Sequence, residues 1–275
     1  IRISPCCRSR SPNRFASWAL PPRVTEVAGG RSVWSTIDWA APWLAPHRSV
    51  GEPIGRLIES GASVVDALNQ ALARRSSRAA AKPRCFVGQQ ALSTGEPYES
   101  FIGRTGSVPT RENAHDLFNG LAWLTHPALK ARLNALHIEQ IEHGAVGAIR
   151  GPVRDALTLF DENAAWLQAP PELIDALRQR DWAALFVTHR VLWSHARLEL
   201  FGHALIEKLM RPRKPITAHV WVVPFEVADP AAWLAGHLGA EVLASRPWLP
   251  LPVLGVPGWW NLNEHPGFYE DATVL

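Results

Sequence analysis

The chain has 275 residues, of which 47% are hydrophobic and 19% are charged, a balance typical of a globular protein rather than a disordered one. The formal net charge is +3, but residues 1–31 hold six arginines against one glutamate, a local charge of +5, so the rest of the chain carries −2. The net positive charge therefore gives no indication of nucleic-acid binding by the folded part, and no nucleic-acid partner is expected. No run of eighteen apolar residues occurs, so we expect no insertion into a membrane.

Residues 1–31 are rich in Arg and Ser and contain no apolar run of signal-peptide length. We interpret them as a disordered leader or upstream translation; an organelle transit peptide is the less favoured alternative. Residues 32–275 contain no flexible linker and no internal repeat, which predicts a single domain. Because Cys6 and Cys7 lie in the leader, only Cys85 remains, and neither a disulfide nor a thiolate metal site is expected. This cysteine content favours a reducing, cytoplasmic location.

Before residue 152, three tryptophans between prolines at 34–46 predict an irregular segment anchored on the core. A strand is predicted over 85–92. Periodic apolar residues and helix-end signals predict four helices: 53–59, 64–74, one from the N-cap Thr110 to Pro127, and 127–142.

After residue 152, a short apolar run at 153–160, bounded by Gly-Pro and by a polar triplet, predicts a buried strand. An alternating segment at 216–223 predicts another, and the proline-rich tail from Pro247 is expected to wrap against the body. Four helices are predicted from periodicity: 171–178, 181–186, the long run 188–211 and 231–238. The fold class is therefore mainly α with a small β-sheet, an α+β protein.

His115, Asp116 and Asn119 lie among apolar residues on all sides of the predicted helix after Thr110, and Asn113 begins the same polar group. A helix without a clean polar face is normally buried. Its polar groups then need partners, a ligand or a metal inside the fold. Two interpretations remain open: the side chains bind a metal, or they are satisfied by other protein groups.

Four residues recur at four-residue spacing along the predicted helix 188–211: His195, Glu199, His203 and Glu207. A His and a Glu one turn apart can bind one ion. His203 and Glu207 are the candidate ligands of this run, beside a glycine, Gly202, that permits close approach of another element, whereas His195 and Glu199 look more like surface residues. The competing interpretation is a helix-stabilising pair or a buried hydrogen bond. For the metal interpretation to hold, the imidazoles of His115 and His203 must lie within about 8 Å of each other.

Asp161, Glu162 and Asn163 follow the predicted strand 153–160, where loop carboxylates often act as ligands or as general acid/base groups. An ordinary polar turn has the same composition. His219 lies in the predicted strand 216–223 and converges on His203 if both strands share one sheet. His137 and His143 are six residues apart, which does not suit ligands on one helix, and we expect both to be exposed.

Seven strings occur in this order along the chain: PTRENAHDLFNGLAWL, LKARLN, DALTLFDEN, DWAALF, LFGHALIEKL, ITAH and LPVLGVPGWW. With them, the chain from about Trp34 to the C-terminus resembles the bacterial family of domain of unknown function 3025. The resemblance implies no established activity and adds nothing to the mechanism.

The sequence thus supports two functional hypotheses. The first is an enzyme with a metal-assisted hydrolytic site that acts on a small molecule, with zinc, iron or manganese as the divalent transition metal. Its candidate ligands are His115, Asp116, His203 and Glu207, and its candidate general bases are Asp161 and Glu162. Further candidate polar-site residues are Asn113, Asn119, Asn163 and His219. The second hypothesis is a non-catalytic binding or structural protein whose buried polar network only supports the fold.

Overall fold

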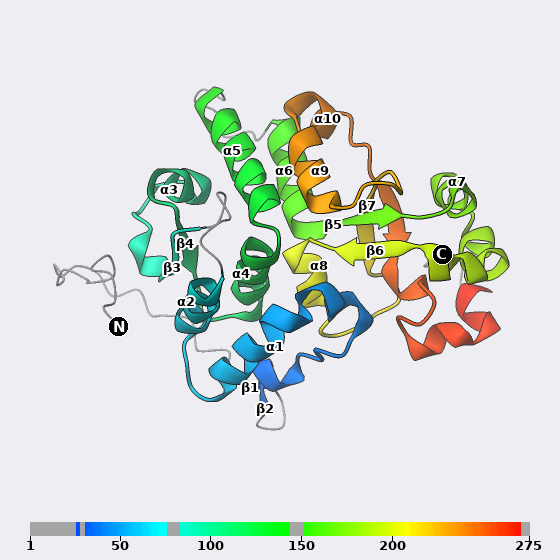
Figure 1. Ribbon diagram of the computed structural model, residues 1–275, viewed down its shortest axis with the longest axis horizontal. Coiled ribbons are helices and arrows are strands. Elements are labelled where there is room, and N and C mark those ends of the chain that lie inside the picture. Colours follow the sequence, from blue (N-terminus) through cyan, green and yellow to red (C-terminus); the bar gives the residue numbers. More distant parts are fainter. Residues whose placement is uncertain (1–25, 28–30, 76–82, 144–150, 271–275) are drawn as a thin grey trace.

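The computed structural model describes residues 26–27, 31–75, 83–143 and 151–270. Helices dominate this part of the chain and surround a four-stranded sheet of order β6-β5-β7-β8 (Figure 1), so the predicted fold class, mainly α with a small sheet, is confirmed. The α-helices are α1 (Ala45–Glu59), α2 (Val64–Arg74), α3 (Tyr98–Thr105), α4 (Ala114–Thr125), α5 (Pro127–His143), α6 (Pro152–Asn163), α7 (Pro171–Gln179), α8 (His203–Lys208), α9 (Pro230–His237) and α10 (Ala240–Ala244). The strands are β1 (Glu26–Val27), β2 (Arg31–Ser32), β3 (Cys85–Gly88), β4 (Ser107–Thr110), β5 (Ala164–Gln168), β6 (Arg197–Leu200), β7 (Thr217–Val222) and β8 (Leu249–Pro252).

The central strand β5 pairs antiparallel with β6 and parallel with β7, so that Ala165 lies opposite Leu200 on one side and Val220 on the other. β8 completes the sheet antiparallel to β7. β5 follows α6 without an intervening loop, and β6 is separated from α8 by only two residues. The end of α6 and the start of α8 therefore meet at one end of the paired strands β5 and β6.

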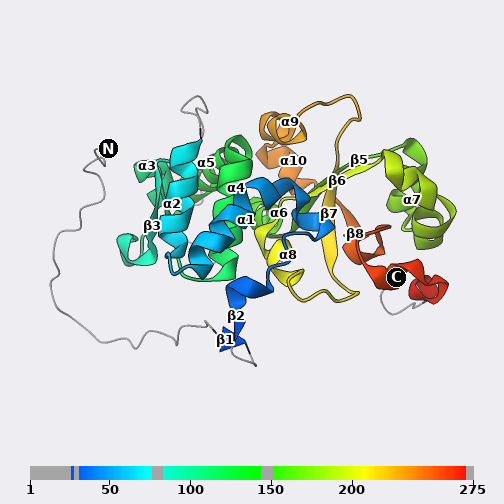
Figure 2. The same cartoon turned by 60° about the horizontal axis from the view of Figure 1, so that its bottom comes forward.

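The two faces of the sheet bury different sets of side chains, because successive residues of a strand point to opposite faces. Trp166 and Trp221 belong to a cluster with residues of α5, α6 and α9. Ala165 and Val220 belong to the larger cluster on the other face. In Figure 2, α9 and α10 lie on the side of the sheet opposite α8.

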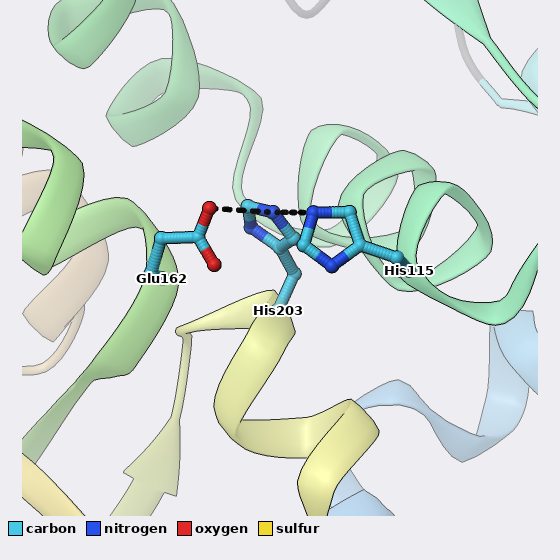
Figure 3. A group of neighbouring side chains, drawn as sticks. All are labelled: His115, Glu162 and His203. Carbon is cyan, nitrogen blue, oxygen red and sulfur yellow. Dashed lines mark hydrogen bonds and ion pairs between the residues drawn. The ribbon is translucent and has the colours of Figure 1, made fainter.

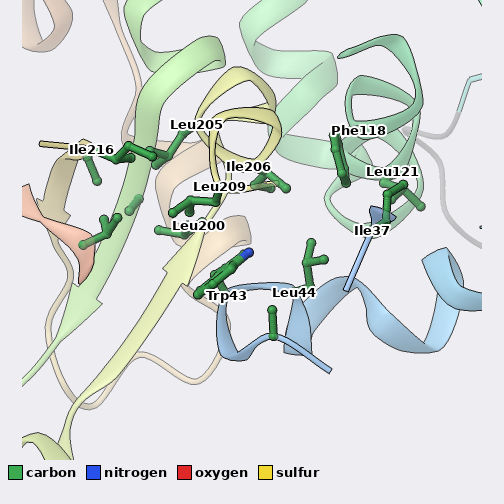
Figure 4. Close-up of a cluster of buried hydrophobic side chains, with 14 of the residues drawn as sticks. Ile37, Trp43, Leu44, Phe118, Leu121, Leu200, Leu205, Ile206, Leu209 and Ile216 are labelled. Atoms are coloured by element: carbon green, nitrogen blue, oxygen red, sulfur yellow. The ribbon is translucent and has the colours of Figure 1, made fainter. Parts of the chain in front are cut away.

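Helix α8 is short, yet it is held firmly by apolar contacts. Leu205, Ile206 and Leu209 are at most 2% exposed and lie between the sheet and the segment that carries Trp43 and Leu44 (Figure 4). Burying each such aliphatic side chain contributes about 1.5–3 kcal/mol. Trp34 and Trp43 are both buried, as expected of the irregular segment at 34–46.

The helix α4 begins three residues later than predicted. The side-chain oxygen of Asn113 accepts a hydrogen bond from the backbone N–H of Asp116 at 2.8 Å, so Asn113 is the N-cap. Thr110 instead lies in β4, opposite Gly88 of the parallel strand β3. The predicted cap was wrong because strand pairing takes up Thr110, whereas Asn113 has the extended backbone that an N-cap needs.

Two predicted elements after residue 152 are wrong. Residues 153–160 lie in the helix α6, in which Ala156, Leu157 and Phe160 share the buried face; their spacing fits a helix, and the apolar content alone misled the strand assignment. The predicted helix 188–211 is broken by β6, where Leu198 and Leu200 alternate and pair with β5. His195 and Glu199 therefore do not share a helix with His203.

Other boundaries differ less. The helix predicted over 53–59 is the second half of α1, which continues through Pro53, and the strand predicted over 85–92 ends at Gly88. Of the predicted leader 1–31, only residues 26, 27 and 31 are described, in the paired strands β1 and β2. Within the described ranges, no helix combines the length and the apolar character needed to cross a bilayer.

Candidate metal centre

Three side chains from three helices meet beside this end of the strands: His115 of α4, Glu162 of α6 and His203 of α8 (Figure 3). Each offers one ligand atom, and these atoms all lie within 4.8 Å of one another. The Nε2 atoms of His115 and His203 are 3.0 Å apart, and Nε2 of His203 is 3.8 Å from Oε1 of Glu162. The ring centroids of the two histidines are 4.4 Å apart, well inside the limit for ligands of one ion.

The backbone brings these side chains together through the contact of α6 with Gly202. The backbone N–H of Gly202 donates to the carbonyl of Ala164 at 2.8 Å, and this places His203, the first residue of α8, beside the last turn of α6. His115 lies in the first turn of α4, which Asn113 caps. The predicted role of Gly202, close approach of another element, is thus what the structure shows.

A carboxylate lies behind the imidazole of His115. Nδ1 of His115 donates a hydrogen bond to Oε2 of Glu207 at 2.9 Å, and this bond raises the pKa of His115. With the proton on Nδ1, the neutral ring presents the lone pair of Nε2 to the cluster. Glu207, predicted as a metal ligand, lies outside the cluster of three and holds the ring of His115 instead.

The imidazole of His203 is buried and faces a second carboxylate. Burial lowers the pKa of His203 to about 4, so the ring is neutral at pH 7. Its buried Nδ1 makes no hydrogen bond within the described chain and lies 3.8 Å from Oδ2 of Asp161. With the Nδ1–H tautomer facing this carboxylate, Nε2 of His203 presents its lone pair to the same point as Nε2 of His115.

Asp161 is held in place by a buried lysine. The ammonium of Lys130, only 4% exposed, donates to Oδ1 of Asp161 at 2.6 Å and to Oδ1 of Asn119 at 2.8 Å. Burial is the largest influence and raises the pKa of Asp161, but the charge and hydrogen bond of Lys130, together with the neighbouring His203, outweigh it, and the pKa of Asp161 is lowered. Asp161 is thus an ionised group whose Oδ1 is held by Lys130, while its Oδ2 faces His203.

Asp116 does not join the cluster, although it was a predicted ligand. Its carboxylate accepts hydrogen bonds from the backbone N–H of Arg111 at 2.6 Å and from the guanidinium of the same residue, through Nη2 at 2.8 Å and Nε at 3.1 Å. Asn119 connects Lys130 to Tyr98, with Nδ2 donating to the tyrosine hydroxyl at 2.9 Å. Asp116 and Asn119 therefore belong to the walls around the cluster, not to its centre.

Asn163 and His219 lie on another side of α8. Asn163 accepts a hydrogen bond from Lys208 at 3.0 Å. These two residues and His219 line a hollow that is separate from the cluster. Burial lowers the pKa of His219. The structure therefore does not bring His219 to His203, as the sequence had suggested it could.

A cavity of about 280 Å³ opens onto the cluster. Besides the predicted residues, its walls include Tyr98, Glu99, Arg111 and His137, which sequence reasoning did not select. His137 was expected to be exposed but is 8% exposed; the side chain of His143 lies outside the described residues. The sequence offered one signal for Tyr98 and for Lys130 behind the cavity wall: both residue types are scarce in a chain with two tyrosines and four lysines.

Glu162 completes the site from the last turn of α6. Burial raises the pKa of its carboxyl group, and the neighbouring His115 opposes this shift. A carboxylate that is partly desolvated and faces two imidazole nitrogens is typical of a metal ligand. Glu162 therefore fits the ligand position better than the general-base role predicted for it.

No curated protein and no solved structure matches this chain. A family model described as "Protein of unknown function (DUF3025)" matches residues 85–275, a range that begins later than the expected Trp34 and includes all three residues of the cluster. The chain therefore belongs to the DUF3025 family.

Proposed function

We propose that His115, Glu162 and His203 bind one divalent transition metal, and that this metal activates water for hydrolysis of a small molecule in the adjacent cavity. The observation that carries the proposal is the convergence of three ligand atoms within 4.8 Å. Two imidazoles and one carboxylate, with a further position open to a cavity, are the usual donor set of catalytic zinc sites. Zinc, iron and manganese all suit these donors.

The carboxylates behind the two histidines support the same proposal. Metal-binding imidazoles usually donate their other N–H to a carboxylate, which fixes the ring and increases its basicity. Glu207 accepts from Nδ1 of His115, and Asp161 faces Nδ1 of His203. Two zinc–nitrogen bonds of about 2.1 Å at a tetrahedral angle separate the nitrogens by about 3.4 Å. A small ring displacement from the 3.0 Å seen here achieves this separation.

The general base is assigned by elimination among the carboxylates that line the cavity. Asp116 is engaged by Arg111, Asp161 by Lys130, and Glu162 is used as a ligand. Glu99 remains: within the described chain its ion-pair contact is the long one of 3.9 Å to Nδ1 of His137, a ring whose pKa burial lowers. A carboxylate free of strong partners at the cavity wall is suited to take a proton from the attacking water.

The non-catalytic alternative rests on the distance between the two imidazoles. A separation of 3.0 Å between the Nε2 atoms is a hydrogen-bond length, so one shared proton satisfies both rings without any metal. In that case Lys130, Asp161, His203, His115 and Glu207 form a structural network that fixes the packing of α4, α6 and α8. The two proposals differ in whether a metal replaces this proton.

Metal content decides between them. The full chain, incubated with one equivalent of zinc and then dialysed, is expected to retain about one equivalent by plasma mass spectrometry. The variants His115→Ala, Glu162→Gln and His203→Ala should retain almost none. His237→Ala, a change at an exposed histidine of α9, is the matched control and should retain zinc. Absence of zinc from the wild type, or its retention in all three variants, supports the structural alternative.

Catalysis is tested separately on the zinc-loaded protein. A panel of chromogenic esters, amides and phosphoesters should show turnover of at least one class. Glu99→Gln should abolish turnover while zinc remains bound, because the change removes the base and leaves the ligands intact. Unchanged turnover in Glu99→Gln contradicts the assigned base but not the metal site.

A further inference from the structure

A chain of hydrogen bonds runs from Lys130 through Asn119 to Tyr98, and its direction is fixed by Lys130. An ammonium group can only donate hydrogen bonds. Because Lys130 donates to Oδ1 of Asn119, the amide oxygen of Asn119 must face the lysine. The amide nitrogen of Asn119 then faces Tyr98 and donates to its hydroxyl oxygen at 2.9 Å. The reverse orientation of this amide is excluded.

The direction of this chain determines what the Tyr98 hydroxyl can do. Its oxygen already accepts a hydrogen bond from Asn119, so its own hydrogen must be donated elsewhere. The described residues make no second hydrogen bond to this hydroxyl, and Tyr98 lines the same cavity as His115, Glu162 and His203. Burial raises the pKa of Tyr98, so the hydroxyl keeps its hydrogen at neutral pH.

We infer that Tyr98 donates a hydrogen bond to an oxygen atom of the substrate, so that the substrate class is one with a carbonyl or phosphoryl oxygen at the bond that is cleaved. This inference rests on the proposed hydrolytic function and adds the group that recognises the substrate. Glu99 is the next residue in the first turn of α3. One turn of α3 therefore supplies both the donor and the base to the cavity that the metal ligands line.

The chemistry balances without a change in Tyr98. The oxygen of water forms a bond to the carbonyl carbon or phosphorus, its proton passes to Glu99, and the π or P–O electrons move onto the substrate oxygen. That oxygen becomes more negative, and the Tyr98 hydrogen bond strengthens as it does so. Collapse of this intermediate expels the leaving group, which takes the proton from Glu99. Removing one such donor typically lowers the rate by about 10²–10³-fold.

The test uses acetohydroxamate, a zinc-binding probe with a carbonyl oxygen, on the zinc-loaded full chain. Tyr98→Phe should weaken its binding about fivefold or more in calorimetry, with zinc stoichiometry unchanged. The matched control is Tyr269→Phe, which alters the only other tyrosine and should leave the affinity unchanged. In protein labelled with 3-fluorotyrosine, saturation with acetohydroxamate should shift the fluorine signal of Tyr98 and not that of Tyr269.

A second variant tests the direction of the hydrogen-bond chain. In Asn119→Asp, the new carboxylate accepts from both Lys130 and Tyr98, so the tyrosine hydrogen turns away from the cavity. Acetohydroxamate should then bind more weakly although the phenol is still present. Equal affinity of the wild type, Tyr98→Phe and Asn119→Asp overturns this inference alone, as does failure of the zinc-loaded wild type to bind the probe. Failure to bind zinc overturns both this inference and the proposed function.

Discussion

Gly202 lies so close to the last turn of α6 that a Cβ atom built on it would stand 2.5 Å from the carbonyl oxygen of Glu162. Real Cβ atoms do not approach an oxygen so closely, so only glycine fits at this position. The contact is with backbone, which cannot move aside as a flexible side chain can. The distance between His203 and Glu162 therefore depends on the absence of one methyl group.

Gly202→Ala should lower both stability and metal affinity. The added methyl group must push α8 away from α6, and overpacking of this kind costs about 1–3 kcal/mol. The same displacement separates His203 from Glu162. Urea unfolding measures the first effect and zinc calorimetry the second.

Gly236→Ala is the control for this change. Gly236 lies in α9 and has no atom within 4 Å of a built Cβ. Alanine at an open helical position should stabilise the protein by about 0.4–1 kcal/mol. A Gly202→Ala protein as stable as the wild type, with unchanged zinc affinity, would show that the contact does not position the site.

The sequence predicted best where a helix has clear ends. Val64–Arg74 has the predicted bounds, and α5 begins at the predicted Pro127. The prediction from sequence was wrong at α6 and at β6, because the short apolar segments there fit the periodicity of a helix as well as that of a strand. β6 is a strand because its backbone pairs with β5, a partner more than twenty-five residues away that local spacing does not reveal.

The site was predicted only in part, because local spacing does not reveal which distant segments come into contact. His115 and His203 were both chosen, and the structure brings them together. Glu207 was chosen for its helical spacing from His203, but its partner is His115 on another helix. Lys130 and Tyr98 were missed, because their roles depend on which helices pack against α4.

The two glutamates of the site should differ in their effect on zinc. Glu162→Gln removes a proposed ligand and should abolish stoichiometric binding. Glu207→Gln keeps the hydrogen bond to His115 but removes the charge, and changes behind a ligand typically cost about 10–100-fold in affinity. Calorimetry on both variants checks this order. If Glu207→Gln lost more affinity than Glu162→Gln, the assigned roles would be reversed.

Zinc affinity should fall as the pH is lowered. Glu207 raises the pKa of His115, and zinc must displace the proton that His115 binds below this pKa. Above that pKa the ring is neutral and no proton is released. Calorimetry in buffers of different ionisation enthalpy counts the protons released. In Glu207→Gln the loss of affinity should begin at a lower pH than in the wild type.

His47 should make folding stability depend on pH away from the metal site. Its Nε2 lies 3.1 Å from the carbonyl of Leu200, and burial lowers its pKa to about 4. Between about pH 6.5 and pH 4, His47 binds a proton in the unfolded chain but not in the folded protein. The contribution of His47 to the free energy of unfolding is therefore complete above pH 6.5. It is lost as the pH falls toward 4, at up to about 1.4 kcal/mol per pH unit.

His47→Gln should remove this contribution. Urea unfolding at pH 7, 6 and 5 should give a shallower loss of stability in the variant than in the wild type. His237→Gln, at an exposed position, should keep the wild-type slope. Identical slopes in all three proteins would mean that His47 takes up its proton without unfolding.

Lys130→Met tests the buried ion pair that supports the site. The change keeps the length of the side chain but leaves the carboxylate of Asp161 without the ammonium now 2.6 Å away, and breaking a buried pair in this way typically costs about 3–5 kcal/mol at neutral pH. The double variant Lys130→Met/Asp161→Asn removes the uncompensated charge as well and should recover part of this loss. Urea unfolding of the two variants measures the recovery. If the double variant were no more stable than Lys130→Met, the cost would come from lost packing around α5, and the charge of Asp161 would not depend on Lys130.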